Sequence, residues 1–332
     1  MTPDHRRRRF LSLALPPALA LLGVPQLSSG EPSIATARLL NGYPPGGVTD
    51  IMCRKLSERL SGIWARHVIV DNRSGAAGRV AVEVLKTAPP DGSTMLVTPG
   101  SVVMMYPHVY KNLSYDVFAD LAPVSVVAVS AFALTIGPAV PASVSTLPEF
   151  TTWCKSHPSG ANCGNAGAGS FPHFMAVLLA REAGIDLIHV PFRGGAPALQ
   201  AVMAGEVAAA LVTEGAALQL RRTGKTRILA TTNAKRSTFL PEVPTFSELS
   251  YSNLSQREWF GAFMPPKTPT DLIASVAESL ADALHQPDVR EVWNNAALSS
   301  EASSPLELKA TLRRDYDFWG PIIKASGFTA EA

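Results

Sequence analysis

The stretch Asn41–Leu60 reads NGYPPGGVTDIMCRKLSERL, which predicts the end of a strand, a sharp turn and then a helix. Met52, Leu56 and Leu60 recur at every fourth position, as in the buried stripe of an amphipathic helix. Two prolines end the strand, and the pair Gly46–Gly47 lacks Cβ atoms, so the backbone can turn sharply and another molecule can come close. We therefore expect this strand, turn and helix to be the unit around which the fold is built.

Such a turn leaves the first N–H groups of the helix without acceptors, and the aligned peptide dipoles place about +0.5 charge at that end. A bound anion fits this position. The alternative is an ordinary strand-to-helix turn in which Thr49 or Asp50 caps the helix. Taken alone, the stretch does not decide between the two.

The start of the chain has the plan of a secretion signal. Four arginines, residues 6–9, precede an apolar run of about fifteen residues, which is shorter than the roughly 20 that a membrane span needs. The segment Arg7–Leu11 also looks like a twin-arginine signal. We assign residues 1–30 to a signal peptide, with cleavage between Ser28 and Ala37, and expect export to the periplasm.

Charge and composition exclude several classes of protein. The 332 residues carry a formal charge of +2, but residues 1–30 hold four arginines and one aspartate. The rest of the chain therefore has 25 basic and 26 acidic residues, a charge of −1, and offers no basic stripe for nucleic acid. With 46% hydrophobic and 17% charged residues, the chain can form the large cores of two ordinary domains.

Three cysteines are too few for a disulfide scaffold. In an oxidising compartment, Cys154 and Cys163 could form a bridge between the end of one helix and the start of the next strand. Cys53 falls on the apolar stripe of the first helix and is expected to be a buried free thiol.

Strand-like and helix-like segments alternate along the chain, which predicts βαβ units with parallel strands. Short β-rich or apolar runs predict strands at 67–72, 94–98, 124–129, 132–136, 161–164, 185–190, 207–212, 225–232 and 259–264. Helical patterns occupy 80–86, 149–156, 172–183, 198–204, 271–285 and 306–323.

Glycine-rich turns follow three of these strands, which end near Gly42, Gly164 and Val190. In open α/β sheets, ligands bind outside the carboxyl ends of the strands. These turns therefore predict a ligand pocket between two lobes.

The common catalytic and cofactor motifs are not found in the sequence. A P-loop would need a glycine at Gln219, and a dinucleotide fingerprint would need one at Pro172. No G-x-S-x-G elbow occurs, and the seven histidines lack metal-ligand spacing. We therefore expect no catalytic set, no cofactor and no metal.

Three further side chains have both a functional and a structural interpretation. His173 follows a glycine turn and either faces the pocket or makes a structural hydrogen bond. Arg193 could bind a ligand carboxylate, although an exposed loop arginine is the commoner case. Glu214 follows an apolar strand and either contacts a ligand ammonium or hydroxyl group or is a surface carboxylate.

With these segments placed, the chain resembles the extracytoplasmic solute receptors of the tripartite tricarboxylate transporter family, often called Bug receptors. The resemblance extends in order over almost the whole chain after the signal. The matching segments are YPPGGVTDIMCRKLSERL, VDNRSGAAGRVAVEVLKTAPPDGSTMLVTPGS, PHVYKNLSYDVFADLAPVSVVA, NCGNAGAGSFPHFMA, VPFRGGAPALQAVMAGEV, AKRSTFLPEVPTFSEL and WFGAFMPPKTP.

The resemblance implies an α/β fold of the two-lobed type II periplasmic-binding-protein class, in which each lobe is a mainly parallel sheet flanked by helices. One lobe would contain residues 37–131 plus 260–332, and the other residues 132–259. It implies a monomeric receptor without enzymatic activity, which captures a small carboxylate solute and delivers it to membrane permease subunits. A ligand sensor for a signalling partner is the alternative, and an enzyme that uses His173 and Glu214 as acid and base is a third.

In that family, two loops hold carboxylate groups largely through backbone N–H groups and ordered water. The sequence departs from the family at Asn165, where a serine or threonine is usual, and at Ala208, near which an aspartate is usual. The expected ligand contacts are Gly46, Gly47, Val48, Thr49, Asp50, Thr98, Ser101, Asn165, Gly169, Ser170, His173, Arg193, Gly194, Gly195 and Glu214.

Overall fold

The computed structural model describes residues 32–192, 194–221 and 224–330, which belong to one compact unit beginning at Pro32. The signal peptide expected at residues 1–30 lies outside the described residues. Within the described ranges, no helix combines the length and the apolar character that crossing a membrane requires.

The first sheet has six strands in the order β11-β4-β10-β3-β1-β2. The first three strands along the chain are mutually parallel, whereas β10 is antiparallel to both β3 and β4. Every residue of β3 is buried, as expected for a strand covered on both faces. The strands are β1 (Thr36–Asn41), β2 (His67–Asn72), β3 (Thr94–Pro99), β4 (Ala122–Ser130), β10 (Glu258–Met264) and β11 (Leu298–Ser299).

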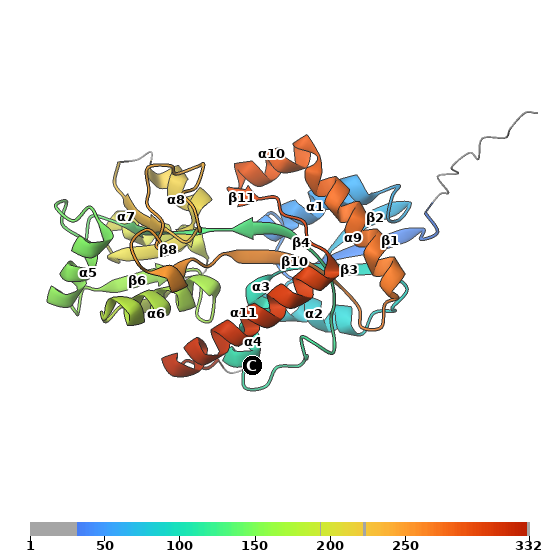
Figure 1. Ribbon diagram of the computed structural model, residues 1–332, viewed down its shortest axis with the longest axis horizontal. Helices are drawn as coiled ribbons and strands as arrows, with labels where there is room; N and C mark the ends of the chain where they lie inside the picture. The colour runs from blue at the N-terminus through green and yellow to red at the C-terminus, as the bar shows by residue number, and fades with distance from the viewer. Residues whose placement is uncertain (1–31, 193, 222–223, 331–332) are drawn as a thin grey trace, which may run out of the picture. The chain divides into compact units, whose positions relative to one another are not determined.

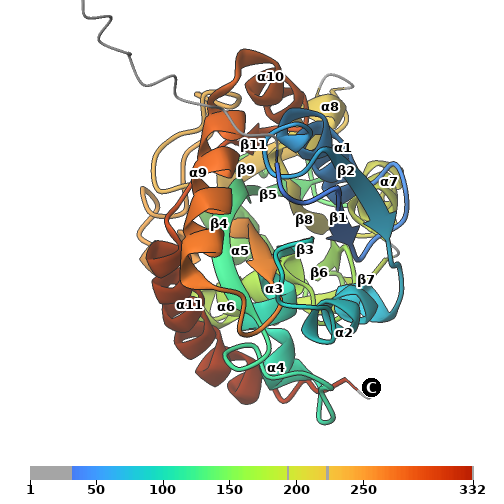
Figure 2. The same cartoon turned by 90° about the vertical axis from the view of Figure 1, so that its right-hand side faces the viewer.

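Helices cover both faces of this sheet, and together they form the first lobe (Figures 1 and 2). One face packs against α1 (Val48–Leu60), α9 (Thr270–His285) and α10 (Pro287–Asn295). The other face packs against α2 (Arg79–Lys86), α3 (Gly100–Met104), α4 (Tyr106–Val109) and α11 (Pro305–Ser326). A short 3₁₀ turn, η1 (Ala76–Gly78), precedes α2. The stripe predicted for α1 is buried, since Met52, Leu56 and Leu60 are at most 1% exposed.

The second sheet has five strands in the order β7-β6-β8-β5-β9 and, with its helices, forms the second lobe. Helices α5 (Leu147–Ser156) and α6 (Phe171–Ala183) pack on one face, and α7 (Gly195–Ala204) and α8 (Glu214–Arg221) pack on the other. The 3₁₀ turn η2 (Ser252–Leu254) contacts α6. The strands are β5 (Phe132–Ile136), β6 (Asn162–Asn165), β7 (Ile188–Pro191), β8 (Ala209–Thr213) and β9 (Arg227–Thr231).

The chain passes directly from one sheet to the other where β4 ends at Ser130 and β5 begins at Phe132. Strand β10 begins at the same junction, because Glu258 pairs with Ser130. Since β10 is antiparallel to β3, the carboxyl ends of β3 and of its parallel neighbour β1 point towards the second lobe. Figure 1 shows β4 and β10 extending from the first lobe towards the second.

The second sheet places its loops at the same junction. Thr213 at the end of β8 pairs with Phe132 at the start of β5. Strand β6 pairs with β8 in the parallel sense, and β7 pairs with β6 in the same sense. The carboxyl ends of β6 and β7 therefore also point towards the first lobe. The glycine-rich turns of both sheets therefore face each other across the junction.

The structure differs from two details of the sequence analysis. Both sheets are mixed, because the strands at the junction, β4, β5 and β10, pair in the antiparallel sense. All three cysteines are free thiols, so the suggested bridge between Cys154 and Cys163 is not formed. Both side chains are buried in one apolar cluster, and burial raises the pKa of the Cys154 and Cys163 thiols to about 12, which keeps them protonated and unreactive.

Candidate functional site

The N-terminus of α1 offers unpaired backbone donors at the junction. Gly46 has a φ of +84°, a conformation that favours glycine, whereas Gly47 is extended and caps the helix without a side chain. The N–H of Ile51 is the first to bond within the helix, to the carbonyl of Gly47. In the described part of the chain, the N–H groups of residues 48–50 have no acceptor. This arrangement suits an anion.

The side chain of Asp50 stabilises this turn from the inside. Its carboxylate accepts hydrogen bonds from the Gly46 N–H at 2.9 Å, from Arg54 Nε at 2.8 Å and from Asn72 Nδ2 at 2.8 Å. Burial acts to raise the pKa of Asp50, but the hydrogen bonds from Arg54, Gly46 and Asn72 outweigh it and lower the pKa. The carboxylate is thus occupied by the protein, and only the Asp50 N–H is free for a ligand.

Two further expected residues lie where β3 ends. Thr98 is buried, and its hydroxyl has no partner among the described residues. Ser101 donates a hydrogen bond of 2.5 Å to Oε1 of Glu258, the first residue of β10. Burial raises the pKa of Glu258 to about 7, although the bond from Ser101 opposes the shift. Glu258 was not expected from the sequence, where its only signal is a charged residue at the start of the apolar run WFGAFM.

In the second lobe, the glycine turn after β6 is held by its own hydrogen bonds. The Ser170 hydroxyl donates to the carbonyl of Gly167 at 2.6 Å, and the Gly169 N–H donates to Nδ1 of His173 at 3.0 Å. Gly167 and Gly169 both have positive φ angles, of 149° and 77°. This geometry explains why the turn needs glycine at these two positions.

His173 has a structural role in this turn. Its ring stacks on that of His189, with 3.7 Å between the ring centroids. Burial, with a smaller effect of His189, lowers the pKa of His173 to about 3, so the ring is neutral and its Nδ1 can accept the Gly169 N–H. Nδ2 of Asn165 lies 2.7 Å from Nδ1 of His189, while Oδ1 of this buried amide has no partner in the described residues. His189 was not found from the sequence.

The remaining expected contacts fall at two other places. Arg193 lies outside the described residues, and Gly194 and Gly195 form the start of α7. Glu214 lies at the junction, where its carboxylate accepts bonds from Asn233 Nδ2 at 2.6 Å and Ser237 Oγ at 2.7 Å. Burial raises the pKa of Glu214. It lines a pocket of about 190 Å³ to which both lobes contribute residues.

The two lobes also meet near the C-terminus. A Cβ atom on Gly169 would lie 3.2 Å from Cγ1 of Val109 in the first lobe and 3.5 Å from the ring of Phe328. The Phe328 ring makes an edge contact with His173 at 4.9 Å, and the Ala330 N–H donates to the Val109 carbonyl at 2.9 Å. The segment after α11 therefore contacts both lobes beside the glycine turn of the second.

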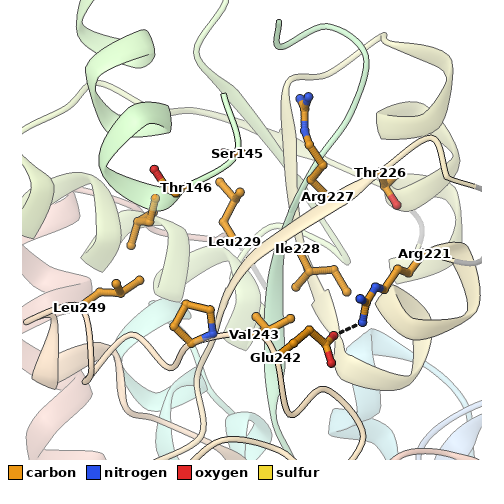
Figure 3. A pocket seen from close by; sticks show the side chains of 12 residues that line it. Ser145, Thr146, Arg221, Thr226, Arg227, Ile228, Leu229, Glu242, Val243 and Leu249 are labelled. Carbon is orange, nitrogen blue, oxygen red and sulfur yellow. Dashed lines mark hydrogen bonds and ion pairs between the residues drawn. The ribbon is translucent and has the colours of Figure 1, made fainter. Parts of the chain in front are cut away.

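A larger hollow, of about 370 Å³, lies within the second lobe between α5, β9 and the segment 242–249 (Figure 3). It is lined by apolar side chains such as Leu229 and Ile228, and an ion pair between Arg221 and Glu242 lies at one side. None of the expected ligand contacts lines it. In the ranges that the structure describes, no group of three or more His, Cys, Asp or Glu residues could hold a metal ion.

Comparisons with known proteins agree with this architecture. The profile of the family described as "Tripartite tricarboxylate transporter family receptor" matches residues 52–328. A protein of Cupriavidus necator, "UPF0065 protein in gbd 5'region", is 30% identical over 291 residues, which cover 86% of this chain and 87% of the relative.

Two solved structures from Rhodopseudomonas palustris have similar folds. Rpa4515 with adipate is 26% identical, with a TM-score of 0.78 over 90% of this chain and 99% of that one. MatC with bound malate is 25% identical, with a TM-score of 0.74 over 88% of this chain and 99% of that one.

Proposed function

This chain belongs to the tripartite tricarboxylate transporter receptor family, and we propose that it captures a small carboxylate-bearing solute between its lobes and delivers it to membrane permease subunits. The observation that carries the proposal is the row of free N–H groups at residues 48–50, at the positive end of α1 and facing the second lobe. Adipate and malate, the ligands of the two similar structures, are both dicarboxylates.

The topology supports a site shared between the lobes. The loops after β1 and β3 face those after β6, β7 and β8, so a solute held by α1 would also meet the turn Asn165–His173. We take residues 37–131 plus 260–332 as one lobe and 132–259 as the other. The two crossovers, at Ala131 and just before β10, would then act as hinges that close on the solute.

The remaining parts of the proposal follow the family's biology. Members of this family are periplasmic binding proteins, so we infer that residues 1–30 direct export and that the mature receptor works in the periplasm as a monomer. Two acidic residues at the junction support a receptor that binds its solute without catalysing a reaction. Asp50 and Glu214 are each engaged by neighbouring donors, and among the described residues no base oriented by a third group is hydrogen-bonded to either of them.

A thermal-shift screen of the mature protein tests this function. The panel contains mono-, di- and tricarboxylates and amino acids, with adipate and malate included. A binding carboxylate should raise the melting temperature in a concentration-dependent way. Its amide, which has the same size but no negative charge, should have no effect. If no carboxylate changed the melting temperature, or if the amide bound as tightly, the proposed function would be wrong.

A further inference from the structure

Glu258 is a buried acid at the point where the two lobes join. It is the first residue of β10 and pairs with Ser130, the last residue of β4. Continuing the register of β10 and β3 places it across from Ser101, whose hydroxyl donates to Oε1 at 2.5 Å. The carboxyl group therefore lies at the carboxyl edge of the first sheet, which faces the second lobe.

In the described part of the chain, Glu258 has no basic partner that would neutralise its charge. Its hydrogen-bond donors belong to Ser101, the hydroxyl and the backbone N–H, and both are neutral. Its charge also reaches the phenols of Tyr43 and Tyr106. Arg257, the adjacent residue, pairs instead with Glu301. Among the described residues, no lysine, arginine or histidine forms an ion pair with Glu258.

The charge of Glu258 also reaches the loop that leads to α1. Tyr43 lies three residues before Gly46. Burial and the neighbouring Tyr106 raise the pKa of the Tyr43 phenol, and the negative charge of Glu258 adds to this shift. A solute carboxylate at residues 48–50 would therefore bring a second negative charge towards an acid that forms no ion pair with a described residue. Two like charges in a poorly solvated region favour protonation of one of them.

We propose that Glu258 makes solute capture proton-linked: a carboxylate solute binds the form of the receptor in which Glu258 is protonated. This inference rests on the proposed function. When Glu258 is ionised beforehand, capture takes up one proton from water, and release of the solute returns it. The protonated Glu258 carboxyl group is neutral, so it does not repel the solute carboxylate that accepts hydrogen bonds from the backbone N–H groups.

The linkage predicts how affinity changes with pH. Below about pH 6.5 Glu258 is already protonated in the free receptor, and affinity should be nearly constant. At higher pH, affinity should fall by up to about tenfold per pH unit, because each capture event must first protonate the acid. From about pH 6.5 upwards both carboxylates of adipate and of malate are ionised, so the fall in affinity over that part of the range reports Glu258 and not the solute.

The test is isothermal titration calorimetry of the mature receptor with adipate and with malate, from about pH 5.5 to about pH 8.5. Titrations in two buffers with different ionisation enthalpies count the protons taken up. The variant Glu258→Gln keeps an acceptor for the Ser101 hydroxyl but cannot ionise. Glu301→Gln is the matched control, since it removes a nearby exposed acid that pairs with Arg257.

We expect proton uptake and weakening affinity at high pH in the parent and in Glu301→Gln, and a flat profile in Glu258→Gln. Affinity that is independent of pH or rises with pH in the parent overturns the inference, as does an unchanged slope in Glu258→Gln. The proton count of the parent decides the question even if the variant does not fold. If neither these dicarboxylates nor any other carboxylate binds at any pH, the receptor function itself fails, and the inference fails with it.

Discussion

Replacing Gly47 by valine should abolish carboxylate binding while leaving the fold intact. Gly47 has a φ of −73°, and a Cβ atom there would meet only the Pro44 carbonyl, at 3.4 Å. Valine therefore fits the backbone, and its cost as a helix cap should be about 1 kcal/mol or less. Its methyl groups would occupy the space in front of the free N–H groups. Losing two charge-assisted hydrogen bonds should cost at least about 3 kcal/mol, or about a hundredfold in Kd.

Gly62→Ala, at the other end of α1, is the matched control for this experiment. A Cβ atom at Gly62 would meet nothing within 4 Å, but the φ of +80° strains any other residue, at about 1 kcal/mol. Urea denaturation should therefore show a small loss of stability in both variants, and calorimetry should show loss of binding only in Gly47→Val. A folded Gly47→Val receptor that binds its solute as tightly as the parent would show that the N-terminus of α1 is not the carboxylate site.

Three further predictions concern buried titratable groups. Asp50→Ala should lower the free energy of unfolding by about 2–4 kcal/mol, since it removes the acceptor of three hydrogen bonds; urea denaturation of parent and variant checks this. The pKa of Glu258 is raised to about 7, so the folded parent loses up to about 3 kcal/mol of stability as pH rises from about 4.5 to about 7. Glu258→Gln should not show this loss and should therefore be more stable than the parent at pH 8 in urea denaturation. Equal stability of parent and variant at pH 8 would contradict this prediction. The pKa of His173 is lowered to about 3, so stability should fall by about 2 kcal/mol as pH drops from 6.5 to about 4.5, and less so in His173→Asn; equal profiles would place the effect elsewhere.

Local patterns in the sequence were enough to locate most helices and strands. The four-residue spacing of Met52, Leu56 and Leu60 identified α1, and all three side chains are buried in the structure. Short or weakly patterned elements could not be predicted from local sequence patterns. Helix α10 and the two-residue strand β11 were not expected, because their place depends on packing against α9 and on pairing with β4.

The glycine turns could be located from sequence because positive φ angles select glycine. The partners of the polar side chains could not, because they come from distant parts of the chain. Asp50 accepts a bond from Asn72, and Glu258 meets Ser101 only because β10 returns to pair with β3. No local pattern contains such pairings, which is also why the stacking of His173 on His189 was unexpected.

Phe328 and Ala330 contact both lobes, so the end of the described chain is a position from which lobe movement can be measured. The Ala330 N–H is bonded to Val109 of the first lobe, while the Phe328 ring packs against Gly169 and His173 of the second. Any change in the angle between the lobes must alter one of these two contacts. A fluorophore attached after Ala330 would therefore report capture of an unlabelled solute.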